Sequence, residues 1–179
     1  MKKIVMSVVA VCFAFCMVSA AEALKINGDF KNVNPKNPIP TNWIKNGNGF
    51  KDASISVVKE GDKNILKFAS KGKHTAIFTA STHKCADNAK FEITLLAKGK
   101  ADEFNAGVYT YGAKNTYLVI RSASFKIDSP DKFTEYKKVI TLTPVKAGKT
   151  EYIRGFIGAM SKPFDVQIKE VKIVPVDAK

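Results

Sequence analysis

Tyrosine and arginine recur at every second position in three short β-prone segments of the chain. The side chains concerned are Tyr109, Tyr111, Tyr117, Arg121, Tyr152 and Arg154. Residues i and i+2 of a strand share one side, so each segment has a Tyr/Arg side and an aliphatic side. The chain has only two arginines among its 29 basic residues, and both fall in this set. An aromatic ring packs on the C–H face of a sugar, and a guanidinium fork binds a carboxylate or sulfate. The pattern predicts a face that binds a neutral or an acidic glycan.

Two other interpretations of this pattern remain open. In the first, the tyrosines are half-buried residues favoured for their β-propensity, and the arginines pair with Glu92 or Glu135. In the second, the chain is a structural or adhesion protein of the cell envelope that docks a protein partner through the same face. A flat or protruding aromatic face would favour protein docking, and a concave groove would favour a glycan.

The sequence has no feature that indicates catalysis. It lacks the Gly-x-Ser-x-Gly, His-Glu-x-x-His and phosphate-loop patterns. His74, His83 and Cys85 are near one another in sequence, but they lack a fourth ligand and the spacing of zinc motifs. We therefore expect a binding protein with no catalytic residue, no metal ligand and no cofactor. The remaining enzymatic alternative is a small lyase or hydrolase, which a pocket of convergent carboxylates would support.

The chain after residue 20 alternates with a period of two and predicts an all-β sandwich. Turn residues at 98–100 and 129–131 are expected to separate strands. The proline-rich segment 32–43 predicts an ordered crossing loop, because proline lacks the donor that a central strand needs. The only tryptophan, Trp43, is expected to pack at the edge of the core. The β-prone runs are 65–69, 75–79, 91–97, 107–111, 116–121, 136–142, 152–157 and 166–174.

Residues 1–20 have the order of a secretory signal peptide. Lys2 and Lys3 precede an apolar run, and Val18-Ser19-Ala20 offers the small residues of a cleavage site. Cleavage there leaves a single domain over 21–179, with Cys85 as its only cysteine and no transmembrane anchor. The expected location is secreted, periplasmic or on the cell surface.

The processed chain would carry 27 basic and 16 acidic residues, a formal charge of +11. Its lysines are scattered singly, whereas a nucleic-acid-binding arm or helix clusters them. We therefore expect a polysaccharide or anionic surface as the partner and no nucleic acid. A solvated, lysine-rich surface is the alternative explanation of the same charge.

Several segments resemble carbohydrate-binding modules of the CenC type, which are galactose-binding-like jelly rolls. That family commonly opens with a strand like Leu24-Lys25-Ile26-Asn27-Gly28-Asp29-Phe30 and continues to a motif like Pro40-Thr41-Asn42-Trp43. Residues 91–99, 133–138 and 164–173 are similar to its central, late and closing strands. The resemblance implies a jelly-roll β-sandwich that binds carbohydrate without catalysis.

The family often holds a structural calcium with acidic residues of its opening and closing strands. Here Lys31 and Lys169 stand where the family often has acids. A lysine in the ligand shell opposes binding of a hard cation, so calcium is not expected. If calcium did bind, Asp29, Asp165 and backbone carbonyls would be the donors.

The signal-peptide pattern predicts the N-terminus of the exported protein. Mass spectrometry should find that it begins between Ala21 and Leu24. Recovery of intact Met1 in a membrane fraction would contradict the prediction.

Overall fold

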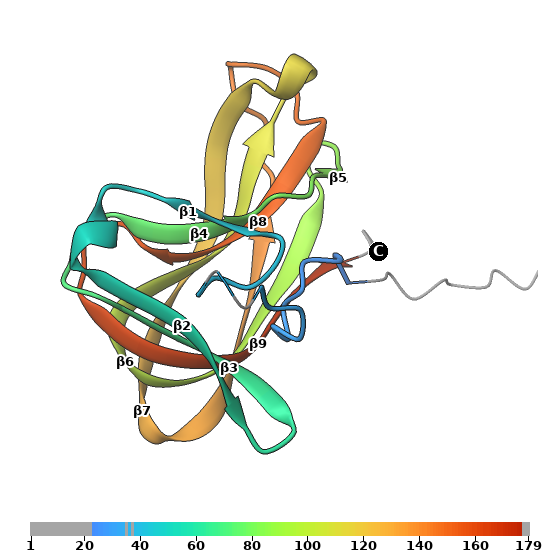
Figure 1. Cartoon of the computed structure of the whole chain (residues 1–179). Helices are drawn as coiled ribbons and strands as arrows, with labels where there is room; N and C mark the ends of the chain where they lie inside the picture. The colour runs from blue at the N-terminus through green and yellow to red at the C-terminus, as the bar shows by residue number, and fades with distance from the viewer. Residues whose placement is uncertain (1–22, 35, 37, 177–179) are drawn as a thin grey trace, which may run out of the picture.

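The computed structural model describes residues 23–34, 36 and 38–176, and the predicted signal peptide lies outside this part (Figure 1). Where the structure is described, all strand pairs are antiparallel, and no helix is long and apolar enough to cross a membrane. The predicted all-β jelly-roll sandwich is confirmed. The elements are β1 (Trp43–Asn46), η1 (Gly49–Asp52), β2 (Ala53–Glu60), β3 (Lys63–Ser70), β4 (Thr75–Thr79), β5 (His83–Lys84), β6 (Lys90–Tyr111), η2 (Ala113–Asn115), β7 (Tyr117–Thr141), β8 (Tyr152–Ala159) and β9 (Phe164–Val176).

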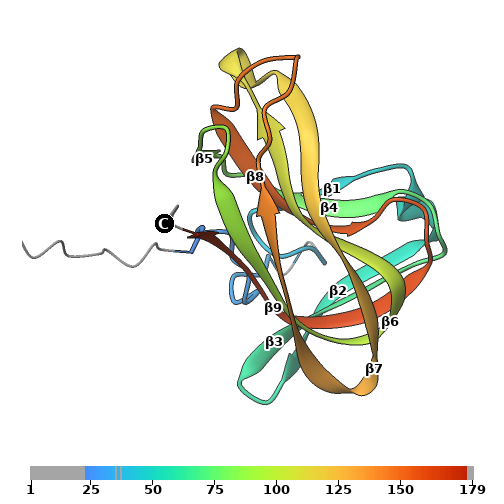
Figure 2. The ribbon, with the colours of Figure 1, turned by 180° about the vertical axis from the view of Figure 1, so that it is seen from behind.

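The strands form one curled sheet in the order β1-β4-β8-β6-β9-β3-β2. Residues 90–101 of β6 pair with β9, and residues 105–111 pair with β8. We call β2, β3, β9 and the first part of β6 layer A. Layer B contains β1, β4, β5, β8 and the last part of β6. β7 pairs with both parts of β6 and runs along the whole molecule beside it (Figures 1 and 2).

The passage of β6 from one layer to the other depends on a bend that begins at Gly99. Its φ of +123° is rare for side-chain-bearing residues, and a Cβ would lie 2.2 Å from the Asp165 carbonyl oxygen. Register shifts flank the bend, between Ala97 and Gly99 and between Ala101 and Phe104. Bulges of this kind bend a strand without ending it. The predicted turn at 98–100 is therefore wrong, because β6 runs through it. At 129–131 β7 also continues, but residues 130–133 bulge out of the ladder opposite Lys98 alone.

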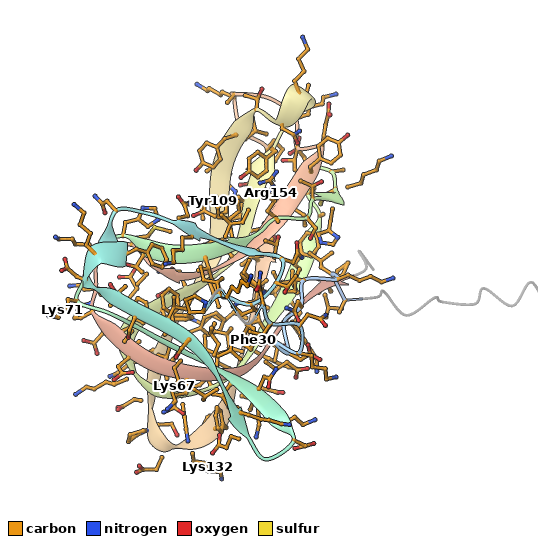
Figure 3. All side chains as sticks on the ribbon, in the orientation of Figure 1. Phe30, Lys67, Lys71, Tyr109, Lys132 and Arg154 are labelled. Atoms are coloured by element: carbon orange, nitrogen blue, oxygen red, sulfur yellow. The ribbon has the colours of Figure 1, made fainter. Side chains whose placement is uncertain are left out.

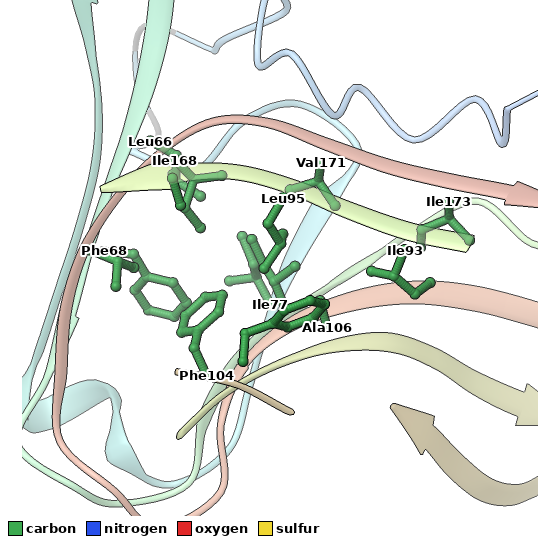
Figure 4. Packing of buried hydrophobic residues seen from close by; sticks show 14 of the residues in the cluster. Leu66, Phe68, Ile77, Ile93, Leu95, Phe104, Ala106, Ile168, Val171 and Ile173 are labelled. Carbon is green, nitrogen blue, oxygen red and sulfur yellow. The ribbon is translucent and has the colours of Figure 1, made fainter. Parts of the chain in front are cut away.

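The main core lies between the layers and contains Phe68, Phe104 and Phe164, the first two of which are labelled in Figure 4. The ring of Phe68 meets those of Phe104 and Phe164 edge-on, with centroids 6.4 and 4.8 Å away. Trp43 is 5% exposed and packs 6.3 Å from Phe30, as predicted for a residue of the core.

The N-terminal segment is irregular where the resemblance implies an opening strand. It is attached to β9 by single hydrogen bonds, from Leu24 N to Ile173 O and from Val171 N to Gly28 O. A Cβ at residue 28 would lie 1.9 Å from the Val171 oxygen, so only glycine allows this approach. Among its described residues, the proline-rich segment before β1 has one isolated bridge, Val33 to Pro40, and is the crossing loop predicted.

Because the core around the bend is tightly packed, a cavity there should lower the stability of the whole domain. Phe104 is fully buried, so Phe104→Ala should lower the free energy of unfolding by about 3–5 kcal/mol in chemical denaturation. Val139→Ala, at a residue 56% exposed on β7, is the control and should change it by less than about 0.5 kcal/mol. Equal effects would contradict this account of the core.

Candidate functional site

The outer side of layer B carries a second, smaller apolar cluster, which we call the aromatic face. Strand register determines its members, because Tyr109 lies opposite Arg154 and Ile120, and Tyr111 opposite Tyr152. The alternate residues of β6 and β8 point into the main core. The predicted sorting of aliphatic and Tyr/Arg residues is confirmed for these two strands. The aromatic face consists of Phe78, Tyr109, Tyr111, Tyr117, Ile120, Tyr152, Arg154 and Phe156.

Arg154 lies among the rings of this face (Figure 3). Its Cζ is 5.1 Å from the ring centroid of Tyr111 and 5.7 Å from that of Phe78. Contacts of this type with ring faces hold a guanidinium in one orientation. Its Nε is buried and has no hydrogen-bond partner, and among the described residues no carboxylate forms an ion pair with it. The guanidinium is thus held in place by rings, and no carboxylate of the described residues neutralises it.

The aromatic face is concave. Asn46 on β1 donates a hydrogen bond of 2.7 Å from Nδ2 to the Tyr109 hydroxyl on β6. These strands are three places apart in the sheet, about 14 Å if it were flat, so the layer must curl to bring the side chains together. Residues of β1 and β4 on one side and of β6 and β7 on the other line an open hollow of about 360 Å³. They are Asn46, His74, Phe78, Tyr109, Tyr111, Tyr117 and Ile120.

Arg121 does not belong to this face, which corrects the sequence prediction for β7. It lies opposite Val108, a core residue, and its Nη2 donates to the Thr143 carbonyl at 3.0 Å. A register shift between Thr110 and Tyr111 inserts an extra β7 residue after Tyr117. The bulge places Tyr117 with Tyr111, 6.1 Å between ring centroids, but reverses the alternation beyond it. Ile120 consequently takes the place predicted for Arg121.

Tyr109 is the most buried of the predicted site residues. It is 4% exposed, and its ring packs 4.8 Å from Phe156 and 5.7 Å from Phe78. Burial raises the pKa of Tyr109, and the hydrogen bond from Asn46 partly offsets this. Burial also raises the pKa of Tyr111, against the neighbouring charge of Arg154. Both phenols therefore stay protonated at neutral pH, and the Tyr109 hydroxyl keeps its own hydrogen to donate, since it accepts from Asn46.

The sequence prediction did not include Asn46, His74, Phe78 and Ile120. Phe78 follows Ile77 in a β-prone segment, so the two side chains point to opposite sides of the strand. This local pattern does not indicate which other strand pairs with the segment. Nothing in the sequence indicates that Asn46, 63 residues away, reaches Tyr109. These neighbours come from long-range pairing and from the curl of the layer.

Acidic residues are absent from the strands around the aromatic face. In the described structure, β1, β4, β5, β8, residues 105–111 of β6 and residues 117–127 of β7 contain no Asp or Glu. Glu92 and Glu135 both pair with Lys137, at 3.2 and 3.8 Å, and not with an arginine. The alternative that these carboxylates pair with the arginines is therefore wrong.

The candidate calcium donors do not converge. Asp29 is paired with Lys31, with 2.9 Å between Oδ2 and Nζ, and this contact lowers the pKa of Asp29. Gly28 is bound to Val171, six residues from Asp165 along β9, which is about 20 Å of strand. Throughout the described residues, no group of three or more His, Cys, Asp or Glu side chains could hold a metal ion. Asp29 and Asp165 thus offer no common shell for calcium.

The chain matches no known protein-family pattern. It matches no curated protein at a significant level. Its structure is similar to the CBM22-1 xylan-binding domain of Paenibacillus barcinonensis Xyn10C, with a TM-score of 0.58 and 13% identity over 89% of this chain and 98% of that one. It is also similar to a family 11 carbohydrate-binding module of Clostridium thermocellum in complex with a β-1,3-1,4-mixed-linked tetrasaccharide. That match has a TM-score of 0.51 and 14% identity over 87% of this chain and 95% of that one.

Other matched structures are parts of larger proteins. The arabinose-bound MgGH51 α-L-arabinofuranosidase matches with a TM-score of 0.57 and 13% identity over 87% of this chain. The chain spans only 26% of that protein and 21% of the bacteriophage CBA120 tailspike domain. At these identities the matches show the fold, which is that of carbohydrate-binding modules, while the CenC type in particular is not shown.

Because Tyr109 is buried, its ring and its hydroxyl should contribute separately to the stability of the domain. Tyr109→Ala should lower the free energy of unfolding by about 3 kcal/mol, and Tyr109→Phe by about 1 kcal/mol for the lost Asn46 bond. Tyr117→Ala, at a ring 52% exposed, should change it by less than about 0.5 kcal/mol. Chemical denaturation of the three variants tests this order, and a stable Tyr109→Ala would contradict the packing described.

Proposed function

We propose that this protein binds a polysaccharide or glycoconjugate through the aromatic face, without catalysis, and prefers an acidic one. The observation that carries the proposal is Arg154, which is held between Phe78 and Tyr111, two residues that line the hollow, on strands that contain no acid. The fold, shared with carbohydrate-binding modules, is consistent with it.

The shape of the face supports a glycan over a protein partner. The hollow is bounded on one side by Asn46 and His74 and on the other by Tyr117 and Ile120. A chain of sugar rings can enter such a hollow, whereas docking of a folded protein favours a flat or protruding surface. The rings of Tyr111 and Tyr117 would stack on sugar C–H faces, and the hydroxyl of Tyr109 would donate to a sugar oxygen.

Arg154 supplies the proposed preference for acid. A guanidinium forms two parallel hydrogen bonds with a carboxylate or sulfate, and here no carboxylate from the described strands competes for it. The formal charge, +13 for the full chain and +11 without Lys2 and Lys3 of the signal peptide, adds a long-range attraction for anions. The signal-like order of residues 1–20 supports a location outside the cytoplasm as part of this proposal.

Binding of the exported protein to a glycan array, followed by calorimetry on the best ligands, tests the proposal. Tyr111→Ala or Tyr117→Ala should weaken the binding of neutral and acidic glycans alike, by about 1 kcal/mol of binding free energy, because each substitution removes a stacking ring. Arg154→Ala should weaken acidic glycans more than neutral ones. That difference should shrink as salt rises, because exposed charges are screened over about 10 Å at 0.1 M. Arg154→Lys should restore only part of the affinity, since an ammonium lacks the planar fork.

Arg121→Ala is the matched control, because it removes the other arginine, on the opposite side of layer B. Its melting temperature must be checked, since Arg121 holds the Thr143 carbonyl. If Arg121→Ala and Arg154→Ala weaken acidic glycans equally, the effect is one of net charge and the proposed site is wrong. If the parent binds none of the glycans, protein docking becomes the better account.

A further inference from the structure

A row of four side chains crosses the aromatic face on the side of η2. The register pairs Lys84 with Tyr152, Tyr152 with Tyr111, and Tyr111 with Tyr117. Directly paired residues of antiparallel strands share one side of the sheet, so the four belong to one surface. Lys84 and Tyr117 at its ends are exposed, and Tyr111 and Tyr152 between them are partly exposed. The face therefore continues beyond the hollow and ends at a lysine.

Lys84 and Arg154 give this surface two separate positive charges. Arg154 is two residues from Tyr152, the partner of Lys84, so the backbone positions are diagonal neighbours about 7–8 Å apart. Within the described part of the chain, neither side chain forms an ion pair or a hydrogen bond. The nearest acids in sequence are Asp87, whose Oδ1 accepts from Thr150 N, and the exposed Glu151. Both cations are thus free to bind anions of a ligand.

We infer that the ligand is a polyanionic glycan with acidic groups on successive units, and not a neutral glycan with one terminal acid. Arg154 binds one acidic group and Lys84 binds the next along the surface. Tyr152, which is paired with Lys84 and two residues from Arg154, lies under the sugar ring beside both cations, and Tyr111 extends this surface on the far side of β8. This inference rests on the proposed function of the aromatic face and adds Lys84 as a second anion-binding position.

One acidic group would need only one of the two cations. Two like charges on neighbouring positions repel when unoccupied, and each can hold a different anionic group of one chain. The absence of acid from the surrounding strands leaves both charges unneutralised, which fits a ligand that neutralises them together.

The test uses oligogalacturonate, which has a carboxylate on every unit, and a neutral oligosaccharide of equal length with one terminal uronate. Lys84→Ala should lower the affinity for oligogalacturonate by about two- to fivefold and leave the affinity for the singly charged glycan unchanged. Arg154→Ala should weaken both. Lys67→Ala is the matched control: an exposed lysine on a strand of layer A, whose removal should change neither affinity. The salt dependence of oligogalacturonate binding should also decrease in Lys84→Ala and not in Lys67→Ala.

The outcomes distinguish the two proposals. If Arg154→Ala weakens both ligands but Lys84→Ala behaves like Lys67→Ala, the inference is overturned and the proposed function stands. The same holds if the parent binds both ligands equally well. If neither these ligands nor any glycan of the array binds the parent, or if Arg154→Ala and Tyr111→Ala have no effect in folded protein, the proposed function fails and the inference fails with it. If the array finds only glycans without successive acidic groups, the inference alone is overturned.

Discussion

The passage of β6 from one layer to the other is the constraint on which the sandwich depends. One strand pairs with β9 over its first part and with β8 over its last, so both layers share its backbone. The strand must therefore bend sharply while it stays paired with its neighbours in the sheet. Gly99 allows the close approach to Asp165, and Phe104 fills the space inside the bend. A side chain at residue 99 or a cavity at residue 104 would act on both layers at once.

The aromatic face is a consequence of this arrangement. Because β6 continues into layer B, Tyr109 and Tyr111 lie beside β8, and the curl of the layer brings Asn46 of β1 to Tyr109. The inner side of the same strands carries the main core. Layer B therefore has apolar residues on both sides, and its outer cluster is partly accessible through a hollow instead of being covered by another element.

The two layers also divide the charge. Layer A contains acids on its strands, among them Glu60, Glu92 and Glu170, and several pair with lysines. The strands of layer B contain none, and Arg154 is held by rings instead of by a carboxylate. A cation oriented by ring contacts keeps its hydrogen-bonding edge for a ligand, whereas a salt bridge would occupy it.

The sequence by itself determined what depends on short-range pattern. Alternation predicted the all-β class, the outward tyrosines of β6 and β8, and the outward Arg154, because neighbouring residues of a strand must point to opposite sides. It also indicated the loop before β1, since prolines exclude a central strand. Only the tertiary structure decided that 98–100 is a bend inside β6 and that a bulge turns Arg121 to the other side. It alone brought Asn46 and Lys84 to the aromatic face. A bulge shifts the alternation by one residue, and pairing between distant strands depends on how the whole chain packs. Neither of these features can be read from a local sequence pattern.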